Sequence, residues 1–582
     1  MEIFSISGLM YKLKKLISPI STGTLFSLFL CAVLLIPKFS VSAQQVKSAA
    51  LEMAQKYLIG RGEVIIRFVK PETISLEQLS TSISIQRFRQ DTITAYANES
   101  GFNRFLQMDI PFEIMPPPSL NPAIFRTKRL QTDDWRNTYP SYSSYIDLME
   151  GFAADHPHLC SLVQFGTSIN GKKLLALKIS DHADIREPEP VVLYTSSMHG
   201  NELLGYVLML RLIDYLLTNY ENDMQIQQLV DQVEIWINPL ANPDGSYFLS
   251  DTSVWGATRF NANQQDLNRN FPVLGDGDWE SRNREPETMA MMNFMEDLEL
   301  VLAANFHGGA ELVNYPWDTW IRLHPDDTWY WYISRCYADT VHAYSPVGYM
   351  TDEDNGITNG YAWYSINGGR QDYTNYYLHA REVTIELSEE NIPPENSLDA
   401  YWNYHRESLL QYIGRTLSGI TGVVTDSLTG NPLEAEIWIE DHDYDSSYVL
   451  SDPSTGIFYR LLTGQHYTLK VAAPEFASKK KTVQVREGEL TSLEVKLLPA
   501  YVQTLYPNPF SDFLYFRVEE AGYNLIVEFF DLLGRKIGQT EQPVYHAGRQ
   551  RIETEGIPFG VYAVRTIYGN QSTRQVMIKM PE

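Results

Sequence analysis

The feature that most constrains the fold is a short polar motif, Ser197-Met198-His199-Gly200-Asn201-Glu202, set between two apolar runs. The run before it, Val191 to Thr195, is apolar and rich in β-branched residues, which is typical of a buried strand. The run after it, Leu203 to Leu217, is rich in leucine and contains no proline, which predicts a buried helix. His199 then lies where a strand ends, and Glu202 in the first helical turn. This crevice is where open α/β sheets bind their ligands.

A neutral imidazole and a carboxylate three residues apart can bind one Zn²⁺, which accepts nitrogen and oxygen ligands. The alternative is a carboxylate near the positive end of the helix dipole, with a histidine nearby by chance. A second strand-like run, Val301 to Phe306, ends at His307-Gly308-Gly309 and offers a third ligand. His199, Glu202 and His307 would leave a fourth position for water, as catalytic zinc sites do. The pKa of that water would fall to about 7.

Two further sets of polar residues suit this chemistry. Glu386 is a lone carboxylate inside the strand-like run Arg381 to Leu387. It predicts either an edge strand with a polar face or a buried base whose raised pKa lets it carry protons. Arg259 and the stretch Asp266-Leu267-Asn268-Arg269-Asn270-Phe271 place two arginines and an asparagine in one loop region. A guanidinium can bind a carboxylate through two parallel hydrogen bonds, although surface arginines without a partner are common.

Together these residues resemble the M14 zinc carboxypeptidase family, in particular its carboxypeptidase N/E branch. The resemblance implies an α/β catalytic domain over residues 130–415, with a mixed twisted sheet, helices on both faces and one Zn²⁺. The matching stretches, in the family's order, are Met198-His199-Gly200-Asn201-Glu202, Asn242-Pro243-Asp244-Gly245, Asp266-Leu267-Asn268-Arg269-Asn270-Phe271, Asn305-Phe306-His307-Gly308-Gly309-Ala310, Gly356-Ile357-Thr358-Asn359-Gly360, Gly368-Gly369-Arg370-Gln371-Asp372-Tyr373 and Thr384-Ile385-Glu386-Leu387-Ser388.

The resemblance implies a catalytic role at each matching position. His199, Glu202 and His307 would hold the zinc ion. Glu386 would act as general base and then as acid to the leaving amine. Arg259 would polarise the scissile carbonyl and stabilise the oxyanion. The implied reaction is hydrolysis of the C-terminal peptide bond of a peptide.

The same resemblance implies a substrate site. Asn268, Arg269 and Tyr364 would hold the terminal carboxylate of the peptide. Asp318 falls where this branch carries the acidic residue that pairs with a basic side chain, and Gln371 matches the glutamine at the floor of that pocket. C-terminal Lys or Arg is therefore the expected substrate.

The chain departs from the branch at one position of this pocket. The branch usually has Met in Gly-Gly-Met-Gln-Asp, whereas this chain has Arg370. If Arg370 pointed inward, it would compete for Asp318 and weaken basic selectivity. A peptidase of the same fold with another C-terminal specificity is therefore one alternative. The other is a surface protein that binds peptides without turnover, against which the complete set of zinc ligands, Glu386 and Arg259 argues.

The parts before the catalytic domain are an expected signal peptide and a small α/β unit. In residues 1–43, lysines precede the apolar core Leu25 to Ile36, and small residues end at Ala43, which is typical of a cleaved signal peptide. Residues 44–125 predict a strand at Glu63 to Val69, a short helix at Ser75 to Ser80 and a strand at Asp109 to Met115. The branch generally lacks such a unit. Lys128-Arg129 follows, so the unit is either a removable pro-region or a permanent domain.

Two all-β parts are expected after the catalytic domain. Residues 418–498 predict short strands separated by turns and resemble the transthyretin-like β-sandwich of this branch. Residues 501–582 resemble the C-terminal sorting domain of proteins exported by the type IX secretion system, through Tyr506-Pro507-Asn508-Pro509-Phe510, Gly560-Val561-Tyr562 and Lys579. This implies export through that machinery, to a secreted or outer-membrane-attached location at the cell surface.

Charge and cysteine content limit the remaining possibilities. The formal net charge of −26 argues against nucleic acid as a partner and would favour cationic ligands. Cys31 lies in the expected signal peptide. Cys160 and Cys336 could pair in an oxidising compartment or remain two separate thiols.

Overall fold

The computed structural model describes residues 43–125, 135–275, 283–499, 505–518, 521–569 and 571–581. The expected signal peptide lies outside these residues except for Ala43, where helix α3 (Ala43–Arg61) begins. The Lys128-Arg129 doublet also lies outside them. Within the described ranges, no helix is both long and apolar enough to cross a membrane.

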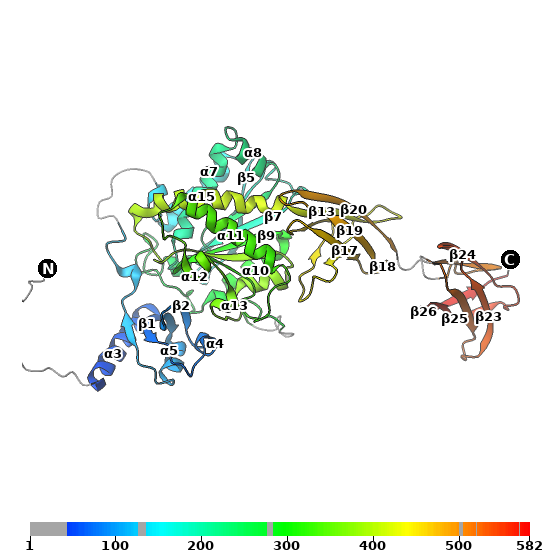
Figure 1. The fold of residues 1–582 in the computed structure, drawn as a ribbon, viewed down its shortest axis with the longest axis horizontal. Helices are drawn as coiled ribbons and strands as arrows, with labels where there is room; N and C mark the ends of the chain where they lie inside the picture. Colours follow the sequence, from blue (N-terminus) through cyan, green and yellow to red (C-terminus); the bar gives the residue numbers. More distant parts are fainter. Residues whose placement is uncertain are drawn as a thin grey trace, which may run out of the picture. The chain divides into compact units, whose positions relative to one another are not determined.

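The catalytic part is built on an eight-stranded sheet, of which β5, β7 and β9 are labelled in Figure 1. The strand order is β11-β10-β12-β9-β7-β8-β6-β5. Its strands are β5 (Cys160–Thr167), β6 (Lys173–Ile179), β7 (Val191–Ser196), β8 (Glu234–Asn238), β9 (Leu302–His307), β10 (Ala310–Tyr315), β11 (Ile357–Asn359) and β12 (Arg381–Ser388). β7 pairs in parallel with β8 and β9, and β9 pairs in parallel with β12. β10 joins β12 in the antiparallel direction. The predicted mixed sheet is confirmed.

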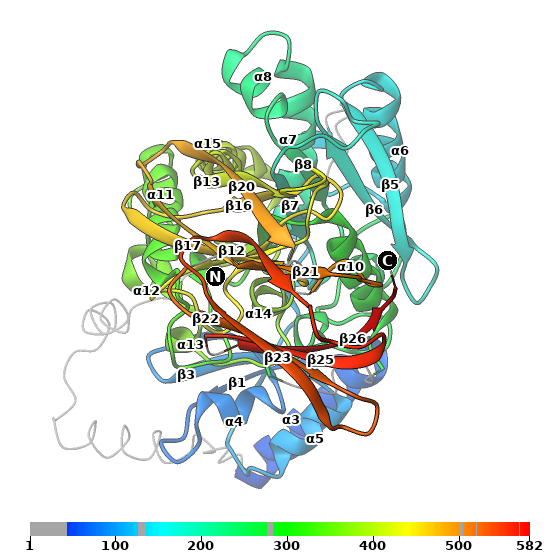
Figure 2. The ribbon, with the colours of Figure 1, turned by 90° about the vertical axis from the view of Figure 1, so that its right-hand side faces the viewer.

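Helices cover both faces of this sheet, as its alternating side chains require. Val192 and Tyr194 of β7 belong to one apolar core, whereas Val191 and Leu193 belong to the other. The helices of the first core are α6 (Tyr142–Asp155), α7 (Leu204–Asn219), α8 (Met224–Val230), α11 (Asp327–Tyr344) and α15 (Leu398–Gly414), of which α11 and α15 pack together (Figure 2). Those of the second are α10 (Pro286–Leu298) and α14 (Arg370–Tyr376).

The helix after the opening motif begins later than its sequence predicts. α7 starts at Leu204, so Glu202 does not lie in the first helical turn, and that prediction was wrong. The backbone N–H of Leu203 donates to Asn391 O at 3.0 Å, and Ser197 Oγ donates to Glu202 O at 2.9 Å. Ser197 also has a left-handed backbone, with φ of 57°. These contacts hold residues 197–202 as a closed loop ahead of the helix.

The N-terminal α/β unit is an antiparallel sheet with the order β2-β3-β1-β4 and two helices. Its elements are β1 (Glu63–Val69), α4 (Leu76–Ser80), β2 (Ser84–Arg89), β3 (Thr92–Asn98), α5 (Glu99–Leu106) and β4 (Glu113–Met115). β1 matches its prediction, and Ser75 caps α4. β4 is shorter than predicted because a turn ends at Asp109, which has a left-handed backbone with φ of 49°.

The remaining elements are short turns of helix and two all-β parts. The short turns are η1 (Pro118–Leu120), η2 (Trp135–Asn137), α9 (Pro243–Ser246), η3 (Leu267–Arg269), α12 (Asp352–Asn355), α13 (Gly360–Trp363), η5 (Glu395–Ser397) and η6 (Arg415–Leu417). Cys160 and Cys336 are both free thiols.

The first all-β part has two four-stranded sheets around one apolar core. Its strands are β13 (Gly419–Asp426), β14 (Glu436–Ile439), β15 (Val449–Leu450), β16 (Ile457–Arg460), β17 (His466–Ala472), β18 (Phe476–Ala477), β19 (Lys479–Gln484) and β20 (Leu490–Pro499). Arg460 is fully buried and pairs with Asp326 of the catalytic part at 2.7 Å. The predicted sandwich architecture is confirmed.

The second all-β part has a two-stranded and a four-stranded sheet around its own core. Its strands are β21 (Phe513–Val518), β22 (Asn524–Phe530), β23 (Lys536–Pro543), β24 (Gly548–Glu553), β25 (Gly560–Tyr568) and β26 (Gln571–Lys579).

Candidate active site

The candidate metal ligands lie at the carboxyl ends of neighbouring parallel strands. β7 ends at Ser196 and His199 follows in the next turn, while His307 is the last residue of β9. Because β7 and β9 pair in parallel, with Ser196 opposite Phe306, both histidines reach the same edge of the sheet. That edge is where sheets of this kind bind ligands.

Glu202 and the two histidines bring their ligand atoms within 3.0 Å of one another. His307 Nδ1 lies 2.8 Å from Glu202 Oε2 and 3.0 Å from His199 Nδ1. His199 Nδ1 lies 3.0 Å from Glu202 Oε1. Of the groups of acidic and histidine side chains that come this close in the described ranges, this one alone is buried throughout and contains two imidazoles.

The protonation states of these side chains fit zinc. Burial lowers the pKa of His307 to about 4, so its ring is neutral near neutral pH. Burial would raise the pKa of Glu202, but the charge of His199 and the hydrogen bonds of both histidines outweigh it and hold that pKa below its ordinary value. Zinc ligands bonded at 2.0–2.1 Å lie roughly 3.3 Å apart. The contacts among these three side chains, at 2.8–3.0 Å, are close to that spacing. A neutral imidazole at His307 and an ionised carboxylate at Glu202 therefore suit a zinc ion.

The other ring nitrogen of each histidine also has a partner. His199 Nε2 lies 3.0 Å from Asp266 Oδ1. His307 Nε2 lies 2.7 Å from the side-chain nitrogen of Asn305. Metal-binding histidines are usually oriented by such a second contact. Neither partner was assigned this role from the sequence, although both lie inside matching stretches.

The loop that carries His199 and Glu202 rests on the Asn242-Pro243-Asp244-Gly245 turn. A Cβ at Gly200 would lie 2.4 Å from the carbonyl carbon of Gly245, so only glycine fits there. Asn242 Nδ2 donates to Met198 O at 3.2 Å. This turn, one of the matching stretches, therefore supports the ligand loop directly.

Two charged residues flank the cluster. Arg259 Nη1 donates to Glu202 Oε1 at 2.9 Å, and its Nε lies 3.3 Å from Asp266 Oδ2. Glu386 lies opposite His307 in the parallel pairing of β12 and β9. Its Oε2 is buried and has no hydrogen-bond partner among the described residues. Burial and the nearby charge of Glu202 raise the pKa of Glu386 well above its ordinary value.

The candidate metal ligands and Glu386 line one cavity. The residues expected to hold a substrate carboxylate line the same cavity. Asn268 and Arg269 lie in η3, whose start is capped by the side chain of Asp266. Arg269 Nη1 donates to Asn268 O at 2.8 Å, and within the described ranges its Nε has no partner. The Tyr364 hydroxyl donates to Ile85 O at 3.3 Å.

A second group, which we call the recognition corner, comprises Asp318, Asn314, Gln371 and Asp372. Asp318 Oδ1 accepts from Asn314 Nδ2 at 3.0 Å and from Gln371 Nε2 at 3.1 Å. The carboxylate of Asp372 accepts the backbone N–H groups of Asp318 and Thr319, each at 2.9 Å. Burial, with the charge of Asp372, raises the pKa of Asp318 to about 8. Asn314 and Asp372 were not singled out from the sequence.

Two amide oxygens of the recognition corner are buried without a donor. Asn314 Oδ1 and Gln371 Oε1 accept no hydrogen bond from any residue that the structure describes. Asn314 lines the same cavity as Asp318 and the metal ligands. Buried acceptors of this kind need a donor, which a bound ligand or a water molecule would supply.

Arg370 does not enter the recognition corner. Its guanidinium is fully buried and donates to Glu382, with Nε 2.9 Å from Oε1 and Nη2 3.0 Å from Oε2. Nη1 donates to Thr195 Oγ1. The competition for Asp318 that its sequence position suggested therefore does not occur, and the main support for an altered specificity is removed.

Strand β2 of the N-terminal unit closes one side of the cavity. Ile85 and Gln86 line it together with the metal ligands, and its volume is only about 30 Å³. Deeper in, Glu63 Oε2 accepts the backbone N–H of Arg259 at 2.8 Å, and the Tyr96 hydroxyl accepts from Asn201 Nδ2 at 2.8 Å. These contacts were missed because the resemblance does not cover this part of the chain.

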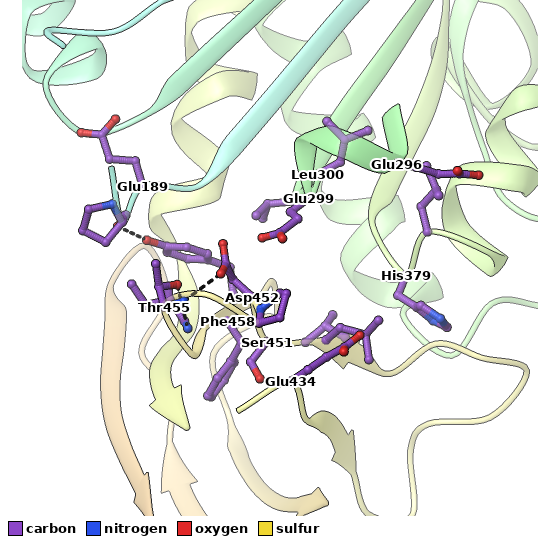
Figure 3. Close-up of a pocket in the computed structure, with 18 of the residues that line it drawn as sticks. Glu189, Glu296, Glu299, Leu300, His379, Glu434, Ser451, Asp452, Thr455 and Phe458 are labelled. Carbon is purple, nitrogen blue, oxygen red and sulfur yellow. Dashed lines mark hydrogen bonds between the residues drawn. The ribbon is translucent and has the colours of Figure 1, made fainter. Parts of the chain in front are cut away.

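A larger cavity of about 300 Å³ lies at the opposite edge of the sheet. It is bounded by the amino ends of β7, β9 and β12 and by the first all-β part. Figure 3 shows Glu299 and Asp452 beside each other there. Arg186 pairs with both, at 3.0 and 3.3 Å, and burial together with Asp452 raises the pKa of Glu299 to about 7. None of the candidate metal ligands lines this cavity.

Comparisons with known proteins agree with this geometry. The zinc carboxypeptidase (peptidase M14) family model matches residues 145–408, and a model of a secretion system C-terminal sorting domain matches residues 504–580. The carboxypeptidase N catalytic chain of Homo sapiens is 33% identical over 379 residues, which cover 59% of this chain and 81% of that protein.

Two further matches extend the comparison. Carboxypeptidase SOL1 of Arabidopsis thaliana is 31% identical over 353 residues, covering 59% of this chain and 69% of that protein. The crystal structure of carboxypeptidase A from Helicoverpa armigera superposes with a TM-score of 0.50 at 17% identity, covering 61% of this chain and 97% of that one. That likeness shows the fold. By sequence match, fold and ligand set, this chain belongs to the zinc carboxypeptidase family.

Proposed function

We propose that this protein is an exported zinc metallocarboxypeptidase that removes C-terminal Lys or Arg from peptides. The observation that carries the proposal is the shared cavity. His199, Glu202, His307 and Glu386 line it together with Asp318. A metal-binding cluster, a base and a buried carboxylate for a cationic side chain thus face the same small space.

The metal cluster and Glu386 supply the hydrolytic chemistry. Zinc held by His199, Glu202 and His307 would polarise a carbonyl and make water more acidic. Glu386 would remove a proton from the attacking water and deliver it to the leaving amine. Its buried Oε2 and raised pKa suit both transfers.

Arg259 would stabilise negative charge on the scissile carbonyl oxygen. Its guanidinium lines the cavity and is held there by Glu202 and Asp266. Preorganised donors of this kind need no reorientation during the reaction, and one donor is worth about 3–4 kcal/mol.

Cleavage at the chain end follows from the carboxylate site. Asn268, Arg269 and Tyr364 lie beside the cluster. A peptide with a free C-terminus would pair with Arg269, whereas an internal peptide segment would leave that guanidinium without an anion. An unpaired charge on this half-buried guanidinium is unfavourable, so binding favours the terminal residue.

The preference for Lys or Arg rests on the recognition corner. A cationic side chain would pair with Asp318 and could donate to the free oxygens of Asn314 and Gln371. A neutral side chain would leave these acceptors unsatisfied, which costs binding energy. Because Arg370 points elsewhere, it does not neutralise Asp318.

Export is supported by the C-terminal part. Residues 504–580 match a secretion system sorting domain, which indicates export to the surface or the medium through that machinery. The expected signal peptide would provide the first step of the route.

A peptide panel tests the proposal. Four short peptides that differ only in their last residue, Arg, Lys, Phe or Glu, are incubated with the protein in the presence and absence of a chelator. The Arg and Lys peptides should lose one residue fastest, and the chelator should abolish all cleavage. Amidated versions serve as controls and should stay intact. Cleavage that resists the chelator would contradict the zinc mechanism, and faster loss of Phe or Glu would contradict the basic preference.

A further inference from the structure

The backbone N–H of Arg370 donates to Asn268 Oδ1 at 3.0 Å, whereas its guanidinium is linked to a candidate metal ligand through buried side chains. Nη1 of Arg370 donates to Thr195 Oγ1. Thr195 Oγ1 donates to Asn305 Oδ1 at 3.1 Å. The amide nitrogen of Asn305 lies 2.7 Å from His307 Nε2. Three consecutive hydrogen bonds therefore lead from the guanidinium to a candidate zinc ligand.

Every residue along this path is shielded from solvent. Arg370 and Thr195 are fully buried, and Asn305 is 1% exposed. Thr195 and Asn305 lie opposite each other in the parallel pairing of β7 and β9. Water therefore cannot easily replace a missing partner, and each link restricts the next.

Glu382 fixes the position of the guanidinium. It accepts two hydrogen bonds from Arg370, and Thr374 Oγ1 donates to its Oε2 at 2.9 Å. A planar guanidinium bound through two parallel hydrogen bonds has one orientation, unlike an ammonium group. Its remaining donor is thereby aimed at Thr195.

We propose that Arg370 is a positioning residue for the metal centre, acting on His307 through Thr195 and Asn305. The proposal rests on the zinc site proposed above. His307 directs Nδ1 toward the other two ligands, so its Nε2 is the atom available to Asn305. An imidazole that binds metal through one nitrogen carries its proton on the other, and the partner of that proton orients the ring.

Arg370 can hold Asn305 beside His307 Nε2 whichever way the Asn305 amide is turned. A guanidinium only donates, so Thr195 Oγ1 always accepts from it. The hydroxyl retains one proton and one further lone pair for Asn305. The amide can therefore present nitrogen or oxygen to His307 while Thr195 stays in place. An apolar side chain at position 370 would leave Thr195 without this fixed donor.

The test compares zinc affinities of purified variants of the full chain, measured by competition with a chelator. Arg370→Met and Thr195→Val should each weaken zinc binding, in the range of about 10–100-fold that such indirect contacts typically contribute. Thr195→Val leaves the Arg370–Glu382 pair intact, so it probes the path even if Arg370→Met folds poorly. Thr195→Ser keeps the hydroxyl that Thr195→Val removes, so its zinc affinity should equal that of the unaltered protein.

Arg460→Met is the matched control. Arg460 is also fully buried between carboxylates, at 2.7 Å from Asp326 and from Asp443, but it lies in the first all-β part. The Arg460→Met substitution should lower the unfolding temperature of the protein without changing its zinc affinity. The visible absorption spectrum of Co²⁺-substituted protein should change in Arg370→Met and not in Arg460→Met, because that spectrum reports ligand geometry.

The outcomes separate this inference from the proposed function. If the unaltered protein binds no zinc tightly, the proposed function fails. If it does, and both Arg370→Met and Thr195→Val bind zinc within twofold of it with unchanged Co²⁺ spectra, the positioning role is overturned. A variant with both Arg370→Met and Thr195→Val should bind zinc about as weakly as either single variant, because both substitutions break the same path.

Discussion

The two halves of the catalytic cavity are built in different ways. We call the first the metal corner, made of His199, Glu202 and His307 with their partners. Both ring nitrogens of each histidine there have a neighbour within 3.0 Å, so the protein itself holds the ligands in place. In the recognition corner, Asn314 Oδ1 and Gln371 Oε1 have no donor among the described residues.

Because of this difference, turnover should depend on the two corners in different ways. A preoriented metal corner should serve every substrate equally, so damage there should abolish turnover regardless of the peptide. An incomplete recognition corner is completed by the substrate side chain, so damage there should affect basic peptides selectively. α14 connects the two, because Arg370 contacts the metal corner's supports while Gln371 and Asp372 contact Asp318.

The largest effect should come from removing a ligand of the metal corner. His307→Ala should lose zinc by elemental analysis and lose turnover of all four peptides, because two ligands cannot hold the ion in an open site. His405→Ala is the control, since His405 is equally buried but contacts Tyr337 and Tyr349 instead. Full zinc occupancy in His307→Ala would refute the ligand assignment.

The next effect should come from the base. Glu386→Gln should keep zinc but lower kcat by about 10²–10⁴-fold for every peptide, because general base catalysis is lost. Glu234→Gln alters a buried carboxylate that pairs with Lys178, and it should keep normal turnover. Unchanged kcat in Glu386→Gln would remove this residue from the mechanism.

Removing the charge of Asp318 in the recognition corner should affect basic peptides without affecting the metal corner. Asp318→Asn should cost about 2–5 kcal/mol in kcat/KM for Arg and Lys peptides, the loss expected for a buried charge pair. The Phe peptide should be affected little, and zinc content should not change. An equal loss for all peptides would mean that the corners are not independent.

Release of the N-terminal unit should produce a gain in activity. Ile85 and Gln86 line the cavity, and Ile85 O accepts from the Tyr364 hydroxyl, so residues 61–125 restrict access to it. Cleavage after Arg129 should raise kcat/KM, and mass spectrometry of the active form should find an N-terminus near Leu130. An active form that begins near Gln44 would instead identify a permanent domain.

The smallest effect concerns pH. The pKa of Asp318 is raised to about 8, so this carboxyl is mostly protonated at pH 7 and becomes ionised as pH rises. A cationic side chain pairs with the ionised form, so kcat/KM for Lys peptides relative to Phe peptides should rise about fivefold from pH 7 to 8. Asp318→Asn should abolish this relative rise. A ratio independent of pH in the unaltered protein would contradict the assignment.

Local patterns were enough to predict several strands, the three candidate metal ligands and Glu386, whereas the family resemblance implied the substrate-binding residues. The run Glu63 to Val69 gave the bounds of β1 as the structure has them, because most of its side chains are buried and the strand follows from this local pattern. All predicted site residues except Gln371 line one cavity, and Gln371 contacts Asp318. Matching motifs carry this information because His307 ends β9, and His199 and Glu202 lie in the loop that follows β7.

Features that depend on distant segments could not be predicted. Arg370 and Thr195 are 175 residues apart, and no local pattern relates them. The closure of the cavity by Ile85 depends likewise on packing between separate parts of the chain. Glu202 lies outside the helix because Leu203 bonds to Asn391, which overrides the helical preference of the leucine-rich run.

The most direct test of the whole account is the position of the metal. Diffraction data collected on both sides of the zinc absorption edge from crystals of the purified protein would locate it without reference to activity. We predict one strong anomalous peak bounded by His199 Nδ1, a carboxylate oxygen of Glu202 and His307 Nδ1. An active enzyme whose zinc peak lies elsewhere, away from these three side chains, would contradict the account.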